Sequence, residues 1–74
     1  MNTIPSRETV ENLRKIYKKG TRVELISMDD AHAPKKGTQG TVFGVDDIGS
    51  IMVKWDNGSS LHVLYSIDCV KIVK

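Results

Sequence analysis

The stretch Val53–Leu61, with the sequence VKWDNGSSL, decides the fold of this 74-residue chain. Asn57 and Gly58 stand between two runs in which apolar and polar residues alternate. Asn-Gly is the preferred pair for a type I′ hairpin turn, because both central residues of that turn need a positive φ. The flanking strands are predicted at residues 50–55 and 60–64. Their predicted inward-facing residues are Ile51, Val53, Trp55, Leu61 and Val63.

Further strands are predicted on both sides of this hairpin. Apolar residues alternate in three more runs, at residues 22–26, 39–45 and 69–73, with Val23, Leu25, Val70 and Ile72 predicted inward. The connections are a long loop, a short loop, the tight hairpin and a one-turn connector, at residues 27–37, 46–49, 56–59 and 65–68. This order is typical of SH3-like barrels, and short, evenly punctuated strands favour a barrel or sandwich. We therefore predict a mainly β chain, with a small five-stranded SH3-like barrel over residues 20–74.

One short amphipathic α-helix is predicted before the barrel, over residues 5–19, after a disordered N-terminus at residues 1–4. Ser6 is the predicted N-cap and Gly20 the predicted C-terminal stop. The apolar stripe of this helix consists of Val10, Leu13 and Tyr17. A helix of this length is marginal alone, so the stripe must pack on the barrel or on another subunit. The outer face of the barrel raises the same question, because four large apolar residues there need a cover: Ile26, Phe43, Met52 and Leu64.

Composition narrows the class of protein but not its ligand. With 39 % hydrophobic and 27 % charged residues, the chain has the composition of one globular domain. No apolar run approaches the roughly 18 residues that cross a bilayer, and the polar N-terminus lacks the apolar core of a signal peptide. Cys69 is the single cysteine, which excludes an internal disulfide. A cytoplasmic location without membrane contact is expected, and the net charge of +2 does not by itself indicate nucleic-acid binding.

No catalytic residue, cofactor or metal site is predicted. Cys69 has His62 and Asp68 nearby in the sequence, but adjacent residues of a strand face opposite sides, so Asp68 and Cys69 do not meet. Cys69 is interpreted as a small, half-buried hydrophobic residue. His32 and His62 lack a recognised metal-ligand spacing. Aspartate pairs in loops usually bond backbone amides of their own turn.

A binding patch is predicted at the loop rim of the barrel. Tryptophan, tyrosine and arginine are the usual hot-spot residues of protein interfaces. The predicted binding residues are Trp55, Tyr65 and Arg22 together with the loop carboxylates Asp29, Asp30, Asp46 and Asp47. These carboxylates suit a basic or polar partner. For Trp55, a place in the core is an equally good interpretation.

Four segments carry a family resemblance. They are residues 17–30 (YKKGTRVELISMDD), 34–42 (PKKGTQGTV), 44–49 (GVDDIG) and 53–61 (VKWDNGSSL). Together they resemble the domain of unknown function DUF4314 over about residues 7–70. The resemblance implies a short protein or module of Firmicutes, their phages and their mobile elements, and it carries no activity and no functional residues. The GTQGTV segment is also similar to the KOW-type barrels of ribosomal and transcription proteins.

Three functions follow as hypotheses, all without catalysis. The first is binding of a host protein, as an inhibitor of host defence, which rests on where the resembled family occurs. The second is KOW-like nucleic-acid binding, with phosphate contacts from lysines and stacking on Phe43 or Trp55; the lysines are Lys35, Lys36, Lys54, Lys71 and those at the helix end. The third is a nucleotide-sequestering oligomer. A homo-oligomer would form through Val10, Leu13 and Tyr17.

Overall fold

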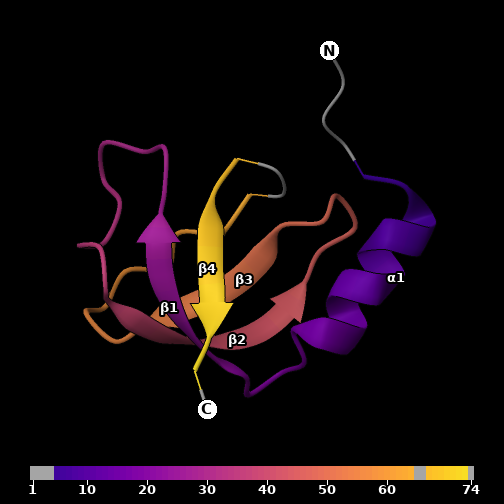
Figure 1. Ribbon diagram of the computed structural model, residues 1–74, viewed down its shortest axis with the longest axis horizontal. Coiled ribbons are helices and arrows are strands. Elements are labelled where there is room, and N and C mark those ends of the chain that lie inside the picture. The colour runs from indigo at the N-terminus through magenta and orange to yellow at the C-terminus, as the bar shows by residue number, and fades with distance from the viewer. Residues whose placement is uncertain (1–4, 65–66, 74) are drawn as a thin grey trace.

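The computed structural model describes residues 5–64 and 67–73 and contains one helix and four strands (Figure 1). These elements are α1 (Arg7–Ile16), β1 (Arg22–Ser27), β2 (Gln39–Val45), β3 (Ile51–Trp55) and β4 (Cys69–Ile72). The strands form one antiparallel sheet in the order β3-β2-β1-β4. The mainly β prediction is confirmed. The predicted disorder of residues 1–4 and the predicted role of Tyr65 lie outside the described residues.

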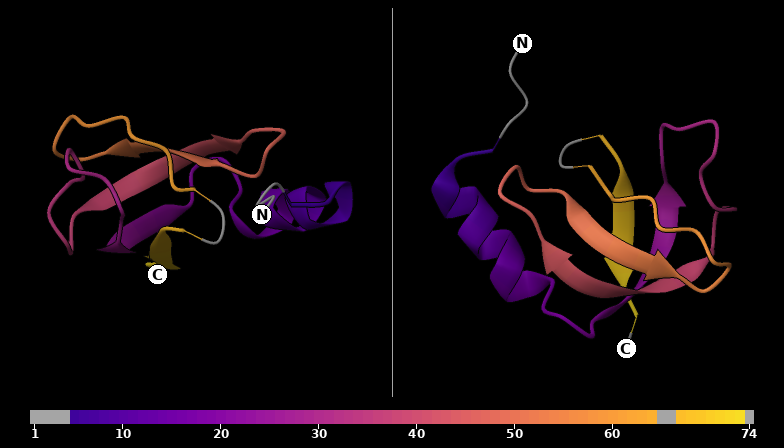
Figure 2. Two further views of the ribbon diagram at one scale, coloured as in Figure 1. Left: turned by 90° about the horizontal axis from the view of Figure 1, so that it is seen from above. Right: turned by 180° about the vertical axis from the view of Figure 1, so that it is seen from behind.

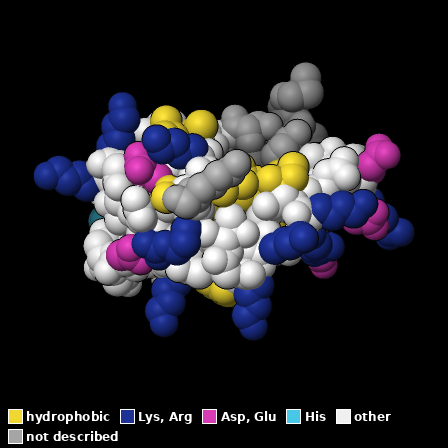
Figure 3. Space-filling model, turned by 60° about the horizontal axis from the view of Figure 1, so that its bottom comes forward, with side chains coloured by type: hydrophobic (Ala, Val, Ile, Leu, Met, Phe, Trp, Pro, Cys, Tyr) yellow, Lys and Arg dark blue, Asp and Glu magenta, His cyan; other side chains and the backbone are white. Residues whose placement is uncertain are grey.

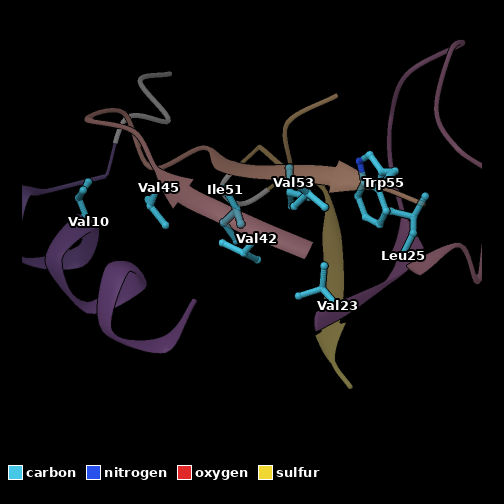
Figure 4. Close-up of a cluster of buried hydrophobic side chains, with 9 residues drawn as sticks. Val10, Val23, Leu25, Val42, Val45, Ile51, Val53 and Trp55 are labelled. Atoms are coloured by element: carbon cyan, nitrogen blue, oxygen red, sulfur yellow. The ribbon is translucent and has the colours of Figure 1, made fainter. Parts of the chain in front are cut away.

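The sheet curls, so that β2 and β3 lie over β1 and β4 with the core between them (Figure 2). Within the strands, alternate side chains point into this core, as the period of two requires. The buried hydrophobic residues are Val10, Val23, Leu25, Val42, Val45, Ile51, Val53, Trp55 and Val63 (Figure 4). Ile72, predicted inward, is instead 42 % exposed. It lies at the end of the edge strand β4, where β1 is the only neighbouring strand of the sheet.

The predicted fourth strand, residues 60–64, is reduced to one bridge in the structure. Val63 pairs with Ile51 through two backbone hydrogen bonds of 2.9 Å each. Before that bridge, the carbonyl of Leu61 accepts a 2.9 Å hydrogen bond from Nε1 of Trp55, so the backbone bonds a side chain there rather than a strand. Among the described residues the sheet has four strands and is not closed, so the predicted five-stranded barrel is not confirmed.

The hairpin after β3 also differs from the predicted two-residue turn. The N–H of Gly58 donates to the carbonyl of Trp55 at 3.0 Å, and the N–H of Trp55 donates to the carbonyl of Ser59 at 3.0 Å. This pattern encloses three loop residues, with Gly58 at φ +92°. A three-residue loop that ends in a left-handed glycine is the common alternative to the type I′ turn.

Helix α1 begins as predicted and ends early. The side chain of Ser6 accepts a 3.1 Å hydrogen bond from the N–H of Thr9, which makes Ser6 the N-cap. The helix ends at Ile16 rather than residue 19 because the backbone already pairs with β2 at Gly20. The N–H of Gly20 donates to the carbonyl of Val42 at 2.7 Å, and residues 17–19 are needed for the connection.

The helix lies beside the sheet, next to the end of β2, and leaves the outer face uncovered (Figures 1 and 2). Val10 enters the core and is 4 % exposed, while Leu13 and Tyr17 pack against the core, so the apolar stripe packs on its own chain. Arg14 donates from Nε to the carbonyl of Val45 at 3.1 Å. Phe43 on the outer face remains 47 % exposed. No helix among the described residues is long and apolar enough to cross a membrane.

Candidate binding site

Trp55, the central residue of the predicted patch, belongs to the core. Its side chain is 2 % exposed, and its Nε1 hydrogen is bonded to the carbonyl of Leu61. A buried indole with a satisfied N–H has neither the surface nor the donor that a partner needs. Of the two interpretations of Trp55, the structure supports the core.

Arg22 lies on the outer face of the sheet and bonds Asp56, for which only a place in a turn is predicted from the sequence. Its Nη1 and Nη2 donate to the two carboxylate oxygens of Asp56 at 2.9 and 2.6 Å. Thr41 Oγ1, at 2.9 Å, and Gln39 Oε1, at 3.3 Å, accept further hydrogen bonds from the same guanidinium. The hydrogen bond from Arg22 holds the pKa of Asp56 below its ordinary value of 3.8, and the same bond raises the pKa of Arg22. Arg22 therefore does not join the loop carboxylates.

The four loop carboxylates are divided between two loops at opposite ends of the molecule (Figure 1). Asp46 accepts hydrogen bonds at its Oδ1 from the N–H groups of Ile48, at 3.1 Å, and Ser50, at 2.8 Å. In the same loop Asp47 forms an ion pair of 2.8 Å with Arg14. These residues stabilise their own loop and its contact with α1. The structure does not assemble the predicted patch.

Asp29 and Asp30 line a shallow pocket of about 360 Å³ at the other end of the molecule. Asp30 accepts a 2.7 Å hydrogen bond from the N–H of His32 within its own loop. Asp68 joins the loop to the chain before β4, since it accepts from the N–H groups of Asp29 and Leu64, each at 2.9 Å. Among the residues that the structure describes, no three His, Cys, Asp or Glu side chains are grouped to hold a metal ion.

An apolar groove of about 220 Å³ opens on the side where the sheet does not close. It lies between α1, the Ile51–Val63 bridge and the start of β4. Its apolar lining comes from Leu13, Tyr17, Ile51, Val63, Leu64 and Val70. The one carboxylate there, Asp68, already accepts two backbone N–H groups, so the groove presents mainly hydrocarbon to a ligand.

Sequence reasoning missed this groove: it predicted Ile51, Val63 and Val70 as inward-facing core residues and placed Leu64 on the outer face. They line a groove rather than a sealed core because residues 60–64 form a single bridge. Cys69 at the rim is exposed, whereas a half-buried position was predicted. The sequence signal for the opening was weak: Ser60 and His62 are the polar residues of the predicted fourth strand.

The fold and this groove define a class of small, mainly β domain with one flanking helix and an apolar groove. The family model of the domain of unknown function DUF4314 matches residues 6–73, nearly the whole chain. The protein belongs to this family, which confirms the resemblance found in the sequence. No curated protein and no solved structure matched the chain.

Proposed function

We propose that the protein is a non-catalytic binding domain that recognises a partner protein through the apolar groove. The observation that carries this proposal is the groove itself, an apolar hollow lined by α1, the Ile51–Val63 bridge and β4. We interpret the sheet as an open SH3-like barrel. Two neighbour relations support this interpretation: Val63 lies next to β3, and β4, the last strand, lies next to β1. The five strands of an SH3-like barrel have this spatial order.

The size of the groove favours a protein side chain over a small-molecule ligand. Sites for small molecules usually enclose about 300–1,000 Å³, and this groove offers about 220 Å³. A hollow of this size takes one or two apolar side chains, in the way that hot-spot residues fill pockets at the centre of an interface. The half-exposed Leu64, at 42 %, lies on the rim and extends the apolar surface toward the partner.

The setting that the family resemblance implies, phages and mobile elements, makes the partner a protein of the bacterial host. A short binder in that setting acts by occupying a surface that the host protein needs. Inhibition of host defence is the role that we propose for it. Catalysis has no part in this role.

The test compares two variants in a pull-down from a host bacterial lysate treated with nuclease. Leu64→Asp places a charge on the groove rim, while Phe43→Ala alters an equally exposed residue on the opposite face of the sheet. We expect the wild type and Phe43→Ala to retain one stoichiometric protein band that Leu64→Asp loses, with unchanged circular dichroism for all three. A band that both variants lose, or that neither loses, refutes the groove as the site. Absence of any nuclease-resistant band refutes protein binding.

A further inference from the structure

The outer face of β2 and β3 carries an exposed aromatic ring in the middle of the sheet. Phe43 lies at a β-bulge, between the pairs Val42↔Val53 and Gly44↔Met52, and its side chain is 47 % exposed. Bulges change the direction of a side chain and are frequent beside functional sites. The helix lies at the end of the sheet, so nothing in the described chain covers this ring.

The residues next to Phe43 on β2 and β3 are small or half-buried. Gly44 has no side chain, and the methyl end of Met52 takes that space: a Cβ on Gly44 would lie 2.7 Å from Met52 Cε. Thr41 pairs with Lys54 on the same face. The half-exposed Phe43 therefore has half-buried neighbours in Thr41, Gly44 and Met52.

Three exposed lysines lie on segments next to Phe43, and the Arg22–Asp56 ion pair lies on the same outer face of the sheet. Lys54 is exposed on the neighbouring strand, and Lys18 and Lys19 are exposed in the turn that the Gly20–Val42 hydrogen bond holds beside Phe43. Among the described residues, the ion pairs involve Arg14, Arg22 and Lys71 and none of these three lysines. Figure 3, which brings the lower side of the molecule forward, shows Lys and Arg side chains distributed around that side, with Asp and Glu side chains among them.

We propose that this face, here called the Phe43 face, binds single-stranded nucleic acid. A base stacks on Phe43, while Lys18, Lys19 and Lys54 contact phosphates on either side of it. Proteins that bind single-stranded nucleic acid commonly combine exposed aromatic rings with a positively charged surface. Any base can stack on such a ring, because every base has a flat apolar face. A duplex buries those faces. The positive charges of the lysines and the exposed Phe43 ring together favour single-stranded nucleic acid as the ligand.

The salt dependence of binding follows from the three lysines. For single strands, the logarithm of the affinity falls with the logarithm of the salt concentration, with a slope of about −0.7 for each phosphate neutralised. Three contacts predict a slope of about −2, so affinity falls about twentyfold between about 50 and 200 mM salt. Loss of one lysine reduces the slope by about 0.7.

The experiment measures fluorescence anisotropy of a labelled oligonucleotide of about twelve thymidines or uridines, titrated with the full chain. Phe43→Ala is expected to weaken binding about tenfold, whereas Phe43→Tyr, which keeps a ring for stacking, binds like the wild type. Lys54→Gln is expected to lower both affinity and salt slope. The control Lys36→Gln changes an exposed lysine in the loop before β2, away from the Phe43 face, and leaves both unchanged.

Four results would overturn the proposal. The first is that the wild type does not bind the oligonucleotide at about 50 mM salt, and the second is that Phe43→Ala binds it as tightly as the wild type with unchanged circular dichroism. The third is that Lys36→Gln and Lys54→Gln lose equal oligonucleotide affinity. The fourth is that the wild type binds polyglutamate, or a duplex of the same length, more tightly than the single strand. DNA and RNA strands share the chemistry proposed, so binding of either supports it. Leu64→Asp, on the other face of the sheet, tests the protein-binding groove and leaves oligonucleotide affinity unchanged.

Discussion

Replacing Trp55 with phenylalanine tests the core on which both proposed surfaces rest. The substitution removes the Nε1 donor of the 2.9 Å hydrogen bond to Leu61 and part of a side chain that is only 2 % exposed. The lost hydrogen bond costs about 1 kcal/mol. The hollow left by the smaller ring adds about 1–2 kcal/mol, since the surroundings relax only in part. We expect the free energy of unfolding to fall by about 2–3 kcal/mol.

The size of the domain makes phenylalanine a better choice than alanine. At about 0.05–0.15 kcal/mol per residue, a chain of this length has a total stability of about 4–11 kcal/mol. Trp55→Ala would cost about 3–5 kcal/mol and would leave a domain at the lower end of that range largely unfolded. Trp55→Phe leaves a folded protein on which the loss is measurable.

Urea unfolding followed by far-ultraviolet circular dichroism is the appropriate assay, because the substitution removes the chain's only tryptophan. With an m-value of about 1 kcal/mol per molar, the midpoint falls by about 2–3 M while the m-value stays constant. Phe43→Leu, at a half-exposed position, is the control and changes stability by less than about 0.5 kcal/mol. Equal midpoints for Trp55→Phe and Phe43→Leu would refute the core position of Trp55 and make it a recognition residue.

Four further substitutions test the packing, capping and electrostatics of the fold. Gly40→Ala lowers the free energy of unfolding by about 2 kcal/mol in urea, because the new Cβ would lie 2.6 Å from a valine side chain and 2.9 Å from a backbone oxygen of β3. Its control is Gly44→Ala, where the new Cβ meets only the end of a flexible methionine side chain. That substitution costs less than about 1 kcal/mol. Ser6→Ala removes the N-cap and lowers the melting temperature by about 4–8 °C, as expected for a loss of about 1 kcal/mol. The pKa of Asp56 is lowered by Arg22, so its contribution is present above the unfolded-state pKa and is lost as pH falls through the folded-state pKa. Urea midpoints at neutral pH and at about pH 2 should therefore show an advantage of the wild type over Asp56→Asn that disappears in acid.

Local pattern was enough to predict the elements whose partners are near in sequence or whose faces are fully buried. The predicted bounds of β2 agree with the structure, and Val23, Val53 and Trp55 face inward as predicted. The N-cap Ser6 was also predictable, since its acceptor role involves an amide only three residues away. These features depend on the alternation of side chains or on contacts within one turn, both of which a sequence displays directly.

The rest depends on contacts between residues far apart in sequence. Arg22 bonds Asp56, which lies 34 residues away, although four other aspartates were grouped with it in the prediction. Apolar alternation in residues 60–64 predicted a strand, but it carries no information that the carbonyl of Leu61 bonds the Trp55 indole instead. An alternating pattern predicts which face of a strand a side chain occupies. It does not predict which donor hydrogen-bonds to the backbone carbonyl.

The open side of the sheet links the stability of α1 to binding in the groove. A ten-residue helix is marginal in water, so α1 depends on the packing of Val10, Leu13 and Tyr17 against the core. Leu13 and Tyr17 also line the groove, and a side chain bound there adds contacts to the same residues that hold the helix. A partner present at about one hundred times its dissociation constant stabilises the folded state by about 2.7 kcal/mol. The Phe43 face does not include Leu13 or Tyr17, so a ligand there adds no contact to these two residues, and the two surfaces are separable by which residues each ligand protects.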